Sequence, residues 1–246
     1  HVRSRRQRQM CIRDRGYIIN IGYFSNIKKR TDKMIDYRRE NMAESFRLAI
    51  LLTLTGGFQD AYSYFARGGV FANAQTGNVV LLAKEIVMGD MAGTKKYLIP
   101  IGAFFVGVIL AVFIEEKLAD RFKFNWRQLI LALQISIVIF CGFMPEKYNN
   151  IVNALLSMSC SMQITAFKKI KGLSTNTAMC VGNIRNASDH LARFIFLKEK
   201  NFLKNSLHYF AIIFVFAIGA AFGYICVGKY ALKGICCLLY TSDAAD

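Results

Sequence analysis

The chain is poor in the residues and motifs that mark small secreted domains and many enzymes. Its 246 residues include 2 Pro, 1 Trp and 7 Cys, with no CxxC pair and no Cys/His cluster. This usage argues against a disulfide framework and structural zinc, so we expect neither a metal nor a cofactor. The sequence also lacks G-x-S-x-G, H-E-x-x-H, P-loop and dinucleotide-binding motifs. We therefore expect no enzymatic activity; a membrane enzyme ranks third among the functions that we consider.

Charge is absent from long parts of the chain. Four stretches contain no charged side chain other than His208: residues 97–114, 128–145, 148–167 and 205–228. Each is close to the roughly 20 residues that cross a hydrocarbon core. Together with a 54% hydrophobic composition, they predict an all-α, multi-pass membrane protein in contact with the lipid bilayer.

The charge that is present is mostly positive. The chain has 32 Lys and Arg against 16 Asp and Glu, a net charge of +16. The basic residues gather between the apolar stretches, as they do in the cytoplasmic loops of membrane proteins. They form no basic stripe interleaved with aromatic residues on a polar fold, so we expect no nucleic-acid partner.

Both ends of the chain look foreign to a membrane protein. Residues 5–15 read RRQRQMCIRDR and residues 237–246 read CLLYTSDAAD, and both are compatible with one sequencing adapter translated in opposite orientations. We expect residues 1–33 to be adapter-derived or upstream sequence, with Met34 or Met42 as the start, and residues 237–246 to be an adapter-derived tail.

Two similar polar motifs interrupt the apolar stretches. The first is GFQDAY at 57–62 followed by QTGN at 75–78; the second is MQITAF at 162–167 followed by CVGN at 180–183. Repeats of this kind in a membrane protein mark two halves that build a site between them. We therefore predict a first membrane repeat at 44–145 and an incomplete second one at 148–236, whose last helix is truncated.

The basic residues also predict the topology. Arg38, Arg39 and Arg47 place the start of the first span, 46–65, in the cytoplasm, and Lys117 and Arg121 do the same for the end of the segment 97–114. Both assignments hold only if the polar segment 70–88 enters the membrane and returns on the same side. The polar segment 174–195 has lysines on both flanks and is predicted to behave alike.

With further spans at 128–143, 149–167 and 206–227, the sequence predicts about six transmembrane helices. They form an inverted repeat with two polar re-entrant or broken-helix segments. Gly107 and Ala111 in one half match Gly219 and Gly223 in the other, at the spacing that lets helices approach closely in lipid.

The sequence GGFQDAYS at 56–63, with GVF at 69–71 and QTGN at 75–78, resembles the YoaK-like family of bacterial membrane proteins. The similarity extends over residues 44–230. The second half departs from the family's Gln-Asn-Ala and Thr-Gly-Asn pattern, because this chain has QITA at 163–166 and VGN at 181–183. The resemblance implies a polytopic protein of about six spans in the bacterial cytoplasmic (inner) membrane, and it implies no particular activity.

Asp60 is the main candidate for function. A carboxylate inside a span costs several kcal/mol and usually lines a cavity, pairs with a cation or relays protons. The alternative is that Asp60 lies at the interface, where it pairs with Arg67 or caps a helix. Gln59 and Gln163 either face each other and bind a polar solute, or hydrogen-bond between helices.

Further candidates lie where each motif predicts the start of a short helix. Thr76, Gly77 and Asn78, with Gly182 and Asn183, permit a turn and leave N–H groups that attract an anion or a carbonyl oxygen; the alternative is capped helices without a ligand.

Arg185 follows the second of these sites. It either binds an anionic solute or filters charge in a pore, or it is neutralised by Asp189 one turn later.

These observations predict a transporter or channel for a small polar or charged solute, with its site between the two halves. The alternative is a non-transporting membrane scaffold, sensor or assembly partner. The sequence is compatible with a homo-oligomer, and it does not identify the solute.

Overall fold

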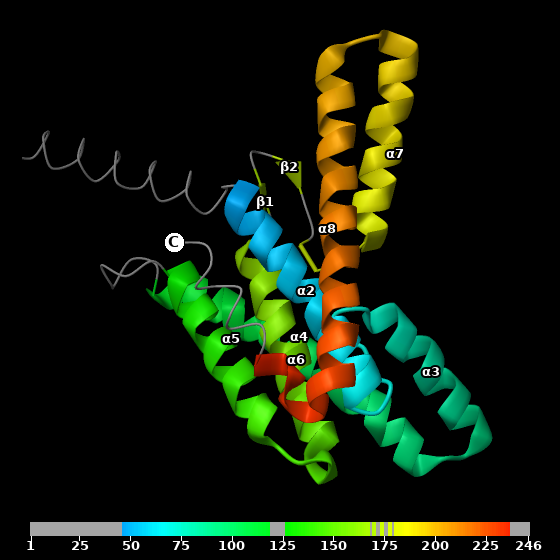
Figure 1. Cartoon of the computed structure of the whole chain (residues 1–246), viewed down its shortest axis with the longest axis vertical. Helices are drawn as coiled ribbons and strands as arrows, with labels where there is room; N and C mark the ends of the chain where they lie inside the picture. Colours follow the sequence, from blue (N-terminus) through cyan, green and yellow to red (C-terminus); the bar gives the residue numbers. More distant parts are fainter. Residues whose placement is uncertain are drawn as a thin grey trace, which may run out of the picture. The chain divides into compact units, whose positions relative to one another are not determined.

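The computed structural model describes residues 46–118, 126–167, 169–170, 173–174, 177–178 and 180–236 (Figure 1). They belong to the second of the two units into which the chain divides, residues 43–246. The segment 1–33, predicted to be adapter-derived or upstream sequence, and the predicted adapter-derived tail 237–246 lie outside the described residues. Arg38, Arg39 and Arg121 of the topology argument lie outside them as well.

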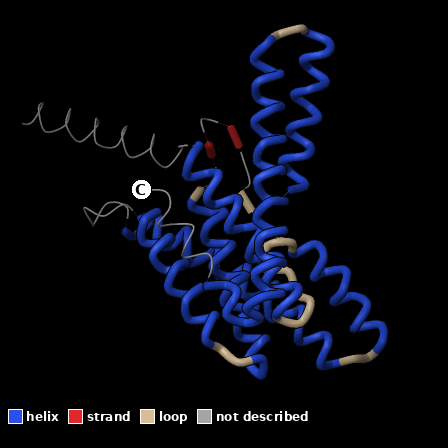
Figure 2. The backbone as a smooth tube through the Cα atoms, viewed as in Figure 1, coloured by secondary structure: helices blue, strands red, loops and turns tan. Residues whose placement is uncertain are grey.

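The described part is almost entirely helical, as predicted (Figure 2). The elements in chain order are α2 (Phe46–Ala66), α3 (Gln75–Met88), α4 (Met91–Leu118), α5 (Trp126–Phe143), η1 (Glu146–Tyr148), α6 (Asn149–Ala166), β1 (Lys169–Ile170), β2 (Leu173–Ser174), α7 (Cys180–Leu197), α8 (Lys200–Tyr230) and η2 (Ala231–Cys236). The two short strands pair antiparallel, with Lys169 opposite Ser174. Each of the five predicted spans falls on a helix: α2, α4, α5, α6 and α8. Helices α4 and α8 extend beyond the predicted segments 97–114 and 206–227 at both ends, and α6 ends one residue before the predicted 149–167.

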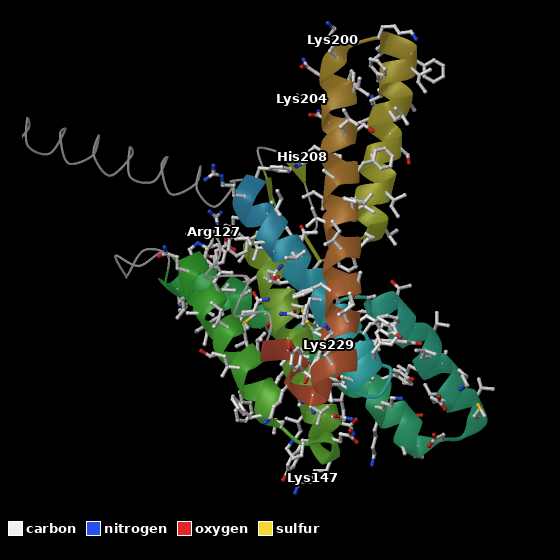
Figure 3. The ribbon with its side chains drawn as sticks, viewed as in Figure 1. Arg127, Lys147, Lys200, Lys204, His208 and Lys229 are labelled. Carbon is white, nitrogen blue, oxygen red and sulfur yellow. The ribbon has the colours of Figure 1, made fainter. Side chains whose placement is uncertain are left out.

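Three segments of the described part are long and apolar enough to cross a membrane: Met91–Lys117, Trp126–Phe143 and Lys200–Ile235. In the most apolar 18-residue stretch of each segment, 22%, 28% and 22% of the residues, respectively, are buried inside the protein. Most of the side chains in these stretches therefore face outward. Basic residues lie at their ends: Figure 3 shows Lys200 and Lys204 at one end of α8 and Lys229 at the other. This arrangement suits helices whose middle parts contact lipid.

Helices α2 and α6 differ from these three because they carry buried polar side chains. In α2 these are Thr53, Gln59, Asp60 and Ser63; in α6 they are Asn153, Ser157, Ser159, Ser161, Gln163 and Thr165. Polar groups are tolerated at membrane depth when protein rather than lipid surrounds them. The more polar composition of α2 and α6 therefore follows from their burial.

The main helix contacts join the two halves of the chain. Helix α2 packs along α8, and α4 packs along α6. A Cβ atom on Gly219 would overlap the backbone of Leu54, and one on Gly223 would lie 2.9 Å from the carbonyl oxygen of Phe58. These glycines therefore permit the close approach of α8 to α2, as the small-residue pattern predicted.

The second interface uses the matching small residues of the first half. A Cβ atom on Gly107 of α4 would lie 2.5 Å from the carbonyl oxygen of Met158 in α6. One turn later, Ala111 is fully buried in a cluster that includes Met162. The two interfaces thus use small residues at corresponding places.

Arg67 connects the end of α2 to its neighbours. Its side chain is fully buried. It donates hydrogen bonds to Tyr62 Oη at 2.8 Å, to Asn149 Oδ1 at 3.2 Å and to the carbonyl oxygen of Cys141 at 2.7 Å. Gly68 and Gly69 follow with positive φ angles of 88° and 76°, so the chain turns sharply after α2.

Candidate functional site

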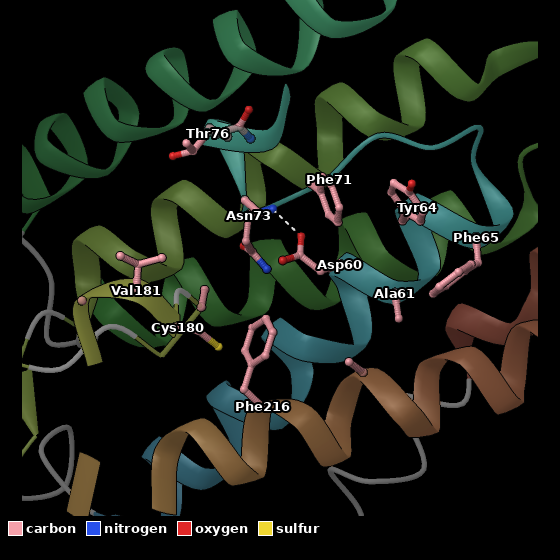
Figure 4. Close-up of a pocket in the computed structure, with 15 residues that line it drawn as sticks. Asp60, Ala61, Tyr64, Phe65, Phe71, Asn73, Thr76, Cys180, Val181 and Phe216 are labelled. Carbon is pink, nitrogen blue, oxygen red and sulfur yellow. Dashed lines mark hydrogen bonds between the residues drawn. The ribbon is translucent and has the colours of Figure 1, made fainter. Parts of the chain in front are cut away.

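A cavity of about 650 Å³ lies where the polar segments 70–88 and 174–195 meet the helix bundle (Figure 4). These two segments are called the first and the second interrupted segment below. Helix α2 contributes Asp60 and Tyr64, the first segment Phe71, Asn73 and Thr76, the second segment Cys180 and Gly182, and α8 Phe216. Most of the other lining residues are apolar. The volume falls within the range of about 300–1,000 Å³ that is typical of small-molecule sites.

Both interrupted segments return to the middle of α2, at Gly56. The Asn73 side-chain amide donates a hydrogen bond to the Gly56 carbonyl oxygen at 2.9 Å. From the second segment, the Thr177 carbonyl oxygen and the Ala178 Cα would each lie 3.1 Å from a Cβ on Gly56. The first segment therefore leaves α2 at Ala66, folds back along it, and starts α3 beside its middle.

Asp60 lies on the wall of the cavity and is 8% exposed. Its Oδ1 atom accepts a hydrogen bond from the backbone N–H of Asn73 at 2.7 Å, and the amides of Ala72 and Ala74 interact with the same carboxylate. The alternative that Asp60 pairs with Arg67 is wrong, because the Arg67 guanidinium binds three other acceptors. Asp60 instead holds the loop that leads into α3.

Asn73 is a site residue that the sequence argument did not single out. It is fully buried and lines the cavity, and its Oδ1 atom has no hydrogen-bond partner in the described part of the chain. An unpaired buried amide oxygen costs about 1–3 kcal/mol, which a ligand with an N–H or O–H group would offset. The signal available in the sequence was a polar residue between two turns of a membrane-embedded segment.

The residues of the QTGN motif at 75–78 have two different roles: Thr76 faces the cavity, and Gly77 and Asn78 contact the preceding loop at Phe71. Thr76 lines the cavity. The Asn78 side chain is buried; it accepts a hydrogen bond from Phe71 N at 3.0 Å and donates one to Phe71 O at 2.7 Å. A Cβ on Gly77 would lie 3.0 Å from the Phe71 ring. Asn78 and Gly77 therefore position Phe71, which itself faces the cavity.

The two glutamines are buried and are not among the residues that line the cavity. Gln59 Oε1 accepts a hydrogen bond from Cys160 Sγ at 2.7 Å. Gln163 Nε2 donates to Thr177 Oγ1 at 3.2 Å, and its Oε1 accepts from Gln134 Nε2 at 2.6 Å. These bonds connect helices and loops, which is the second of the two roles considered for them.

The second motif reaches the cavity through Gly182, at the start of α7. Asn183 is buried one residue later, whereas Arg185 is exposed on α7 and is not among the lining residues. The expected pairing of Arg185 with Asp189 is replaced by an ion pair between Asp189 Oδ2 and Arg193 Nε at 2.8 Å. Both arginines are four residues from Asp189, so spacing alone could not distinguish them.

The structure thus gathers Asp60, Thr76 and Gly182 at one cavity and places Arg185 elsewhere. Within the described ranges, no group of three or more His, Cys, Asp or Glu side chains could hold a metal ion.

A family model described as "Protein of unknown function (DUF1275)" matches residues 48–241. The chain belongs to this family. The DUF1275 chain is also 28% identical, over 182 residues, to the "UPF0700 transmembrane protein YoaK" of Bacillus subtilis (strain 168). The match covers 70% of this chain and 80% of that protein. No solved structure matches.

These relationships confirm the YoaK-like resemblance of the GGFQDAYS and QTGN motifs. Together with the apolar helices α4, α5 and α8, they identify the DUF1275 chain as a membrane protein.

Proposed function

We propose that this DUF1275 protein is a transporter or channel for a small polar or charged solute, which binds in the cavity beside Asp60. The observation that carries the proposal is the meeting of both interrupted segments at Gly56 around that cavity. Broken segments with helix ends at mid-membrane are the usual plan of a solute site in transporters. The protein would have about six spans in the bacterial inner membrane and no enzymatic activity.

An inverted repeat underlies the proposal. In this scheme α2, α3 and α4 correspond to α6, α7 and α8. A pseudo-twofold axis would exchange the α2–α8 interface with the α6–α4 interface, and these are the most extensive contacts in the described part. The small residues at both interfaces support the same correspondence.

The path of the first segment supports the re-entrant geometry. The loop after Ala66 returns to the level of Gly56, so α3 starts beside the middle of α2. Movement of the α3–α4 pair against the α7–α8 pair would then open the cavity to alternate sides. Since the chain has no ATP-binding motif, flux would be coupled to an ion or be passive.

The test is flux in proteoliposomes, measured with a panel of radiolabelled amines, amino acids and inorganic ions. Asp60→Asn should abolish the flux that the unaltered protein supports, because it removes the cavity's acidic group while its size stays the same. Asp189→Asn is the matched control, since that carboxylate is exposed on α7 away from the cavity. Protein abundance and thermal stability should stay unchanged in both variants.

The non-transporting scaffold makes the opposite prediction. It expects no flux of any solute above that of empty liposomes, either from the unaltered protein or from the Asp60→Asn variant. A flux that Asp60→Asn leaves unchanged would remove Asp60 from the transport site.

A further inference from the structure

We propose that the solute is a small organic amine in its protonated form, with an apolar or aromatic body. The Asp60 carboxylate would bind its ammonium group, and Phe71 and Phe216 would enclose its body. This inference rests on the proposed function and narrows its solute to one chemical class.

The charge of the cavity favours a cation. Among the lining residues that the structure describes, Asp60 is the one acidic residue, and Lys, Arg and His do not occur. The Asp60 carboxylate is 8% exposed in mostly apolar surroundings, and its described partners are neutral backbone N–H groups, so a positive charge in the cavity would stabilise it further. An anionic solute would add a second negative charge to the same cavity.

The polar atoms near Asp60 favour a cation that carries N–H groups. The Asn73 N–H donates to one oxygen of the Asp60 carboxylate and the amides of Ala72 and Ala74 interact with it, which leaves lone-pair sites of the roughly four for a donor in the cavity. The Asn73 Oδ1 atom is a buried acceptor without a partner in the described part of the chain, on the same cavity wall. An ammonium group has up to three donors and could satisfy both acceptors.

The aromatic residues favour an organic cation over an inorganic one. Figure 4 shows the Phe71 and Phe216 rings on either side of the Asp60 carboxylate. The Tyr64 ring stacks on Phe71 with centroids 4.6 Å apart. Aromatic faces attract ammonium groups and bury the apolar part of a ligand. Mg²⁺ and Ca²⁺ instead need six or more oxygen ligands, and no group of three or more His, Cys, Asp or Glu side chains that could hold a metal ion occurs in the ranges that the structure describes.

Cys180 provides a native reporter, because it lines the same cavity and its side chain is partly accessible. The purified full-length protein in nanodiscs would be treated with three methanethiosulfonates: cationic trimethylammonium-ethyl, neutral hydroxyethyl and anionic sulfonatoethyl. The rate at Cys180 is the difference between the unaltered protein and Cys180→Ala, which measures the background of the other cysteines. Each rate is divided by the rate of the same reagent with a free thiol.

We expect the cationic reagent to exceed the anionic one by about tenfold or more after this correction, because the Asp60 charge acts on Cys180 across the same cavity. Asp60→Asn should bring the ratio close to one, and Asp189→Asn should leave it unchanged. The ratio cancels any change in the reactivity of the thiol itself. Benzylamine should slow the modification of Cys180, whereas benzyl alcohol and benzoate of similar size should not.

Equal rates for the two charged reagents, a preference for the anionic one, or protection by benzoate would overturn the amine assignment; the flux assay would still decide whether the protein transports. Failure of all three reagents to modify Cys180 would mean that the cavity is closed to solutes. That outcome would overturn both the amine assignment and the proposed site.

Discussion

Close contact between α2 and α8 is essential to this fold, and Gly57→Ala tests it. Gly57 lies on the face of α2 that contacts α8. A Cβ atom there would overlap the carbonyl oxygen of Phe216 and would lie 3.0 Å from the backbone nitrogen of Ala220. Backbone atoms in a helix cannot turn aside as the end of a side chain can. The two helices would therefore have to separate along their interface.

The expected size of the effect follows from two opposing contributions. Alanine is favoured over glycine inside a helix by about 1 kcal/mol. Overpacking a close interface costs about 1–3 kcal/mol, and a clash with the backbone of two α8 residues, Phe216 and Ala220, places Gly57→Ala at the upper end. The net loss is then about 2 kcal/mol. Gly102→Ala in α4 is the control, because a Cβ there meets nothing within 4 Å, and it should gain about 1 kcal/mol.

The assay is thermal unfolding in mild detergent, followed by fluorescence-detected size-exclusion chromatography of a fluorescent fusion. A difference of about 3 kcal/mol between the two variants corresponds to about 6–12 °C in apparent Tm for a chain of this size. If Gly57→Ala melts at or above the temperature of Gly102→Ala, the α2–α8 interface is not as close as the structure has it.

Three further predictions concern the loop, the buried cation and the topology. Arg67→Met should destabilise the protein by about 3 kcal/mol or more, because three hydrogen bonds of a buried guanidinium are lost. The control is Arg193→Met at an exposed position, which should change stability by less than about 1 kcal/mol in the same melting assay. Equal melting temperatures of the two variants would contradict the role of Arg67. Asn78→Ala should cost about 1–3 kcal/mol, since Phe71 loses both of its backbone bonds to Asn78; an unchanged Tm would show that the loop does not depend on them. Lys95→Cys should react with an impermeant maleimide in intact cells, and Lys117→Cys should react only after permeabilisation. The reason is that the inverted repeat places the start of α4 outside the cell and its end in the cytoplasm. The reverse labelling pattern would refute the re-entrant arrangement of the segment 70–88.

Much of the helical architecture follows from local sequence. The charge-free stretches of the chain predict α4, α5, α6 and α8, because a helix that faces lipid must keep charged residues at its ends. The interruption before α3 is also local: Gly68 and Gly69 allow the turn, and the QTGN sequence starts the next helix at Gln75. The GGFQDAYS and QTGN motifs suffice to indicate the family.

The partners of individual side chains depend on tertiary structure. Gln59 and Gln163 hold corresponding places in the two motifs, yet one binds Cys160 and the other Gln134 and Thr177. Hydropathy and spacing describe one segment at a time, so they do not reveal which neighbour satisfies a buried polar group.

Because hydropathy and spacing describe one segment at a time, they also could not reveal which candidate residues share one site. The sequence marked Asp60, Thr76 and Gly182 as candidates without bringing them together, and it passed over Asn73. Only the return of both interrupted segments to Gly56 places these residues around one cavity. The sequence by itself determined a helical membrane protein with two polar interruptions; tertiary packing decided which polar side chains hold the interruptions in place and which face the cavity, because those contacts join residues far apart in the chain.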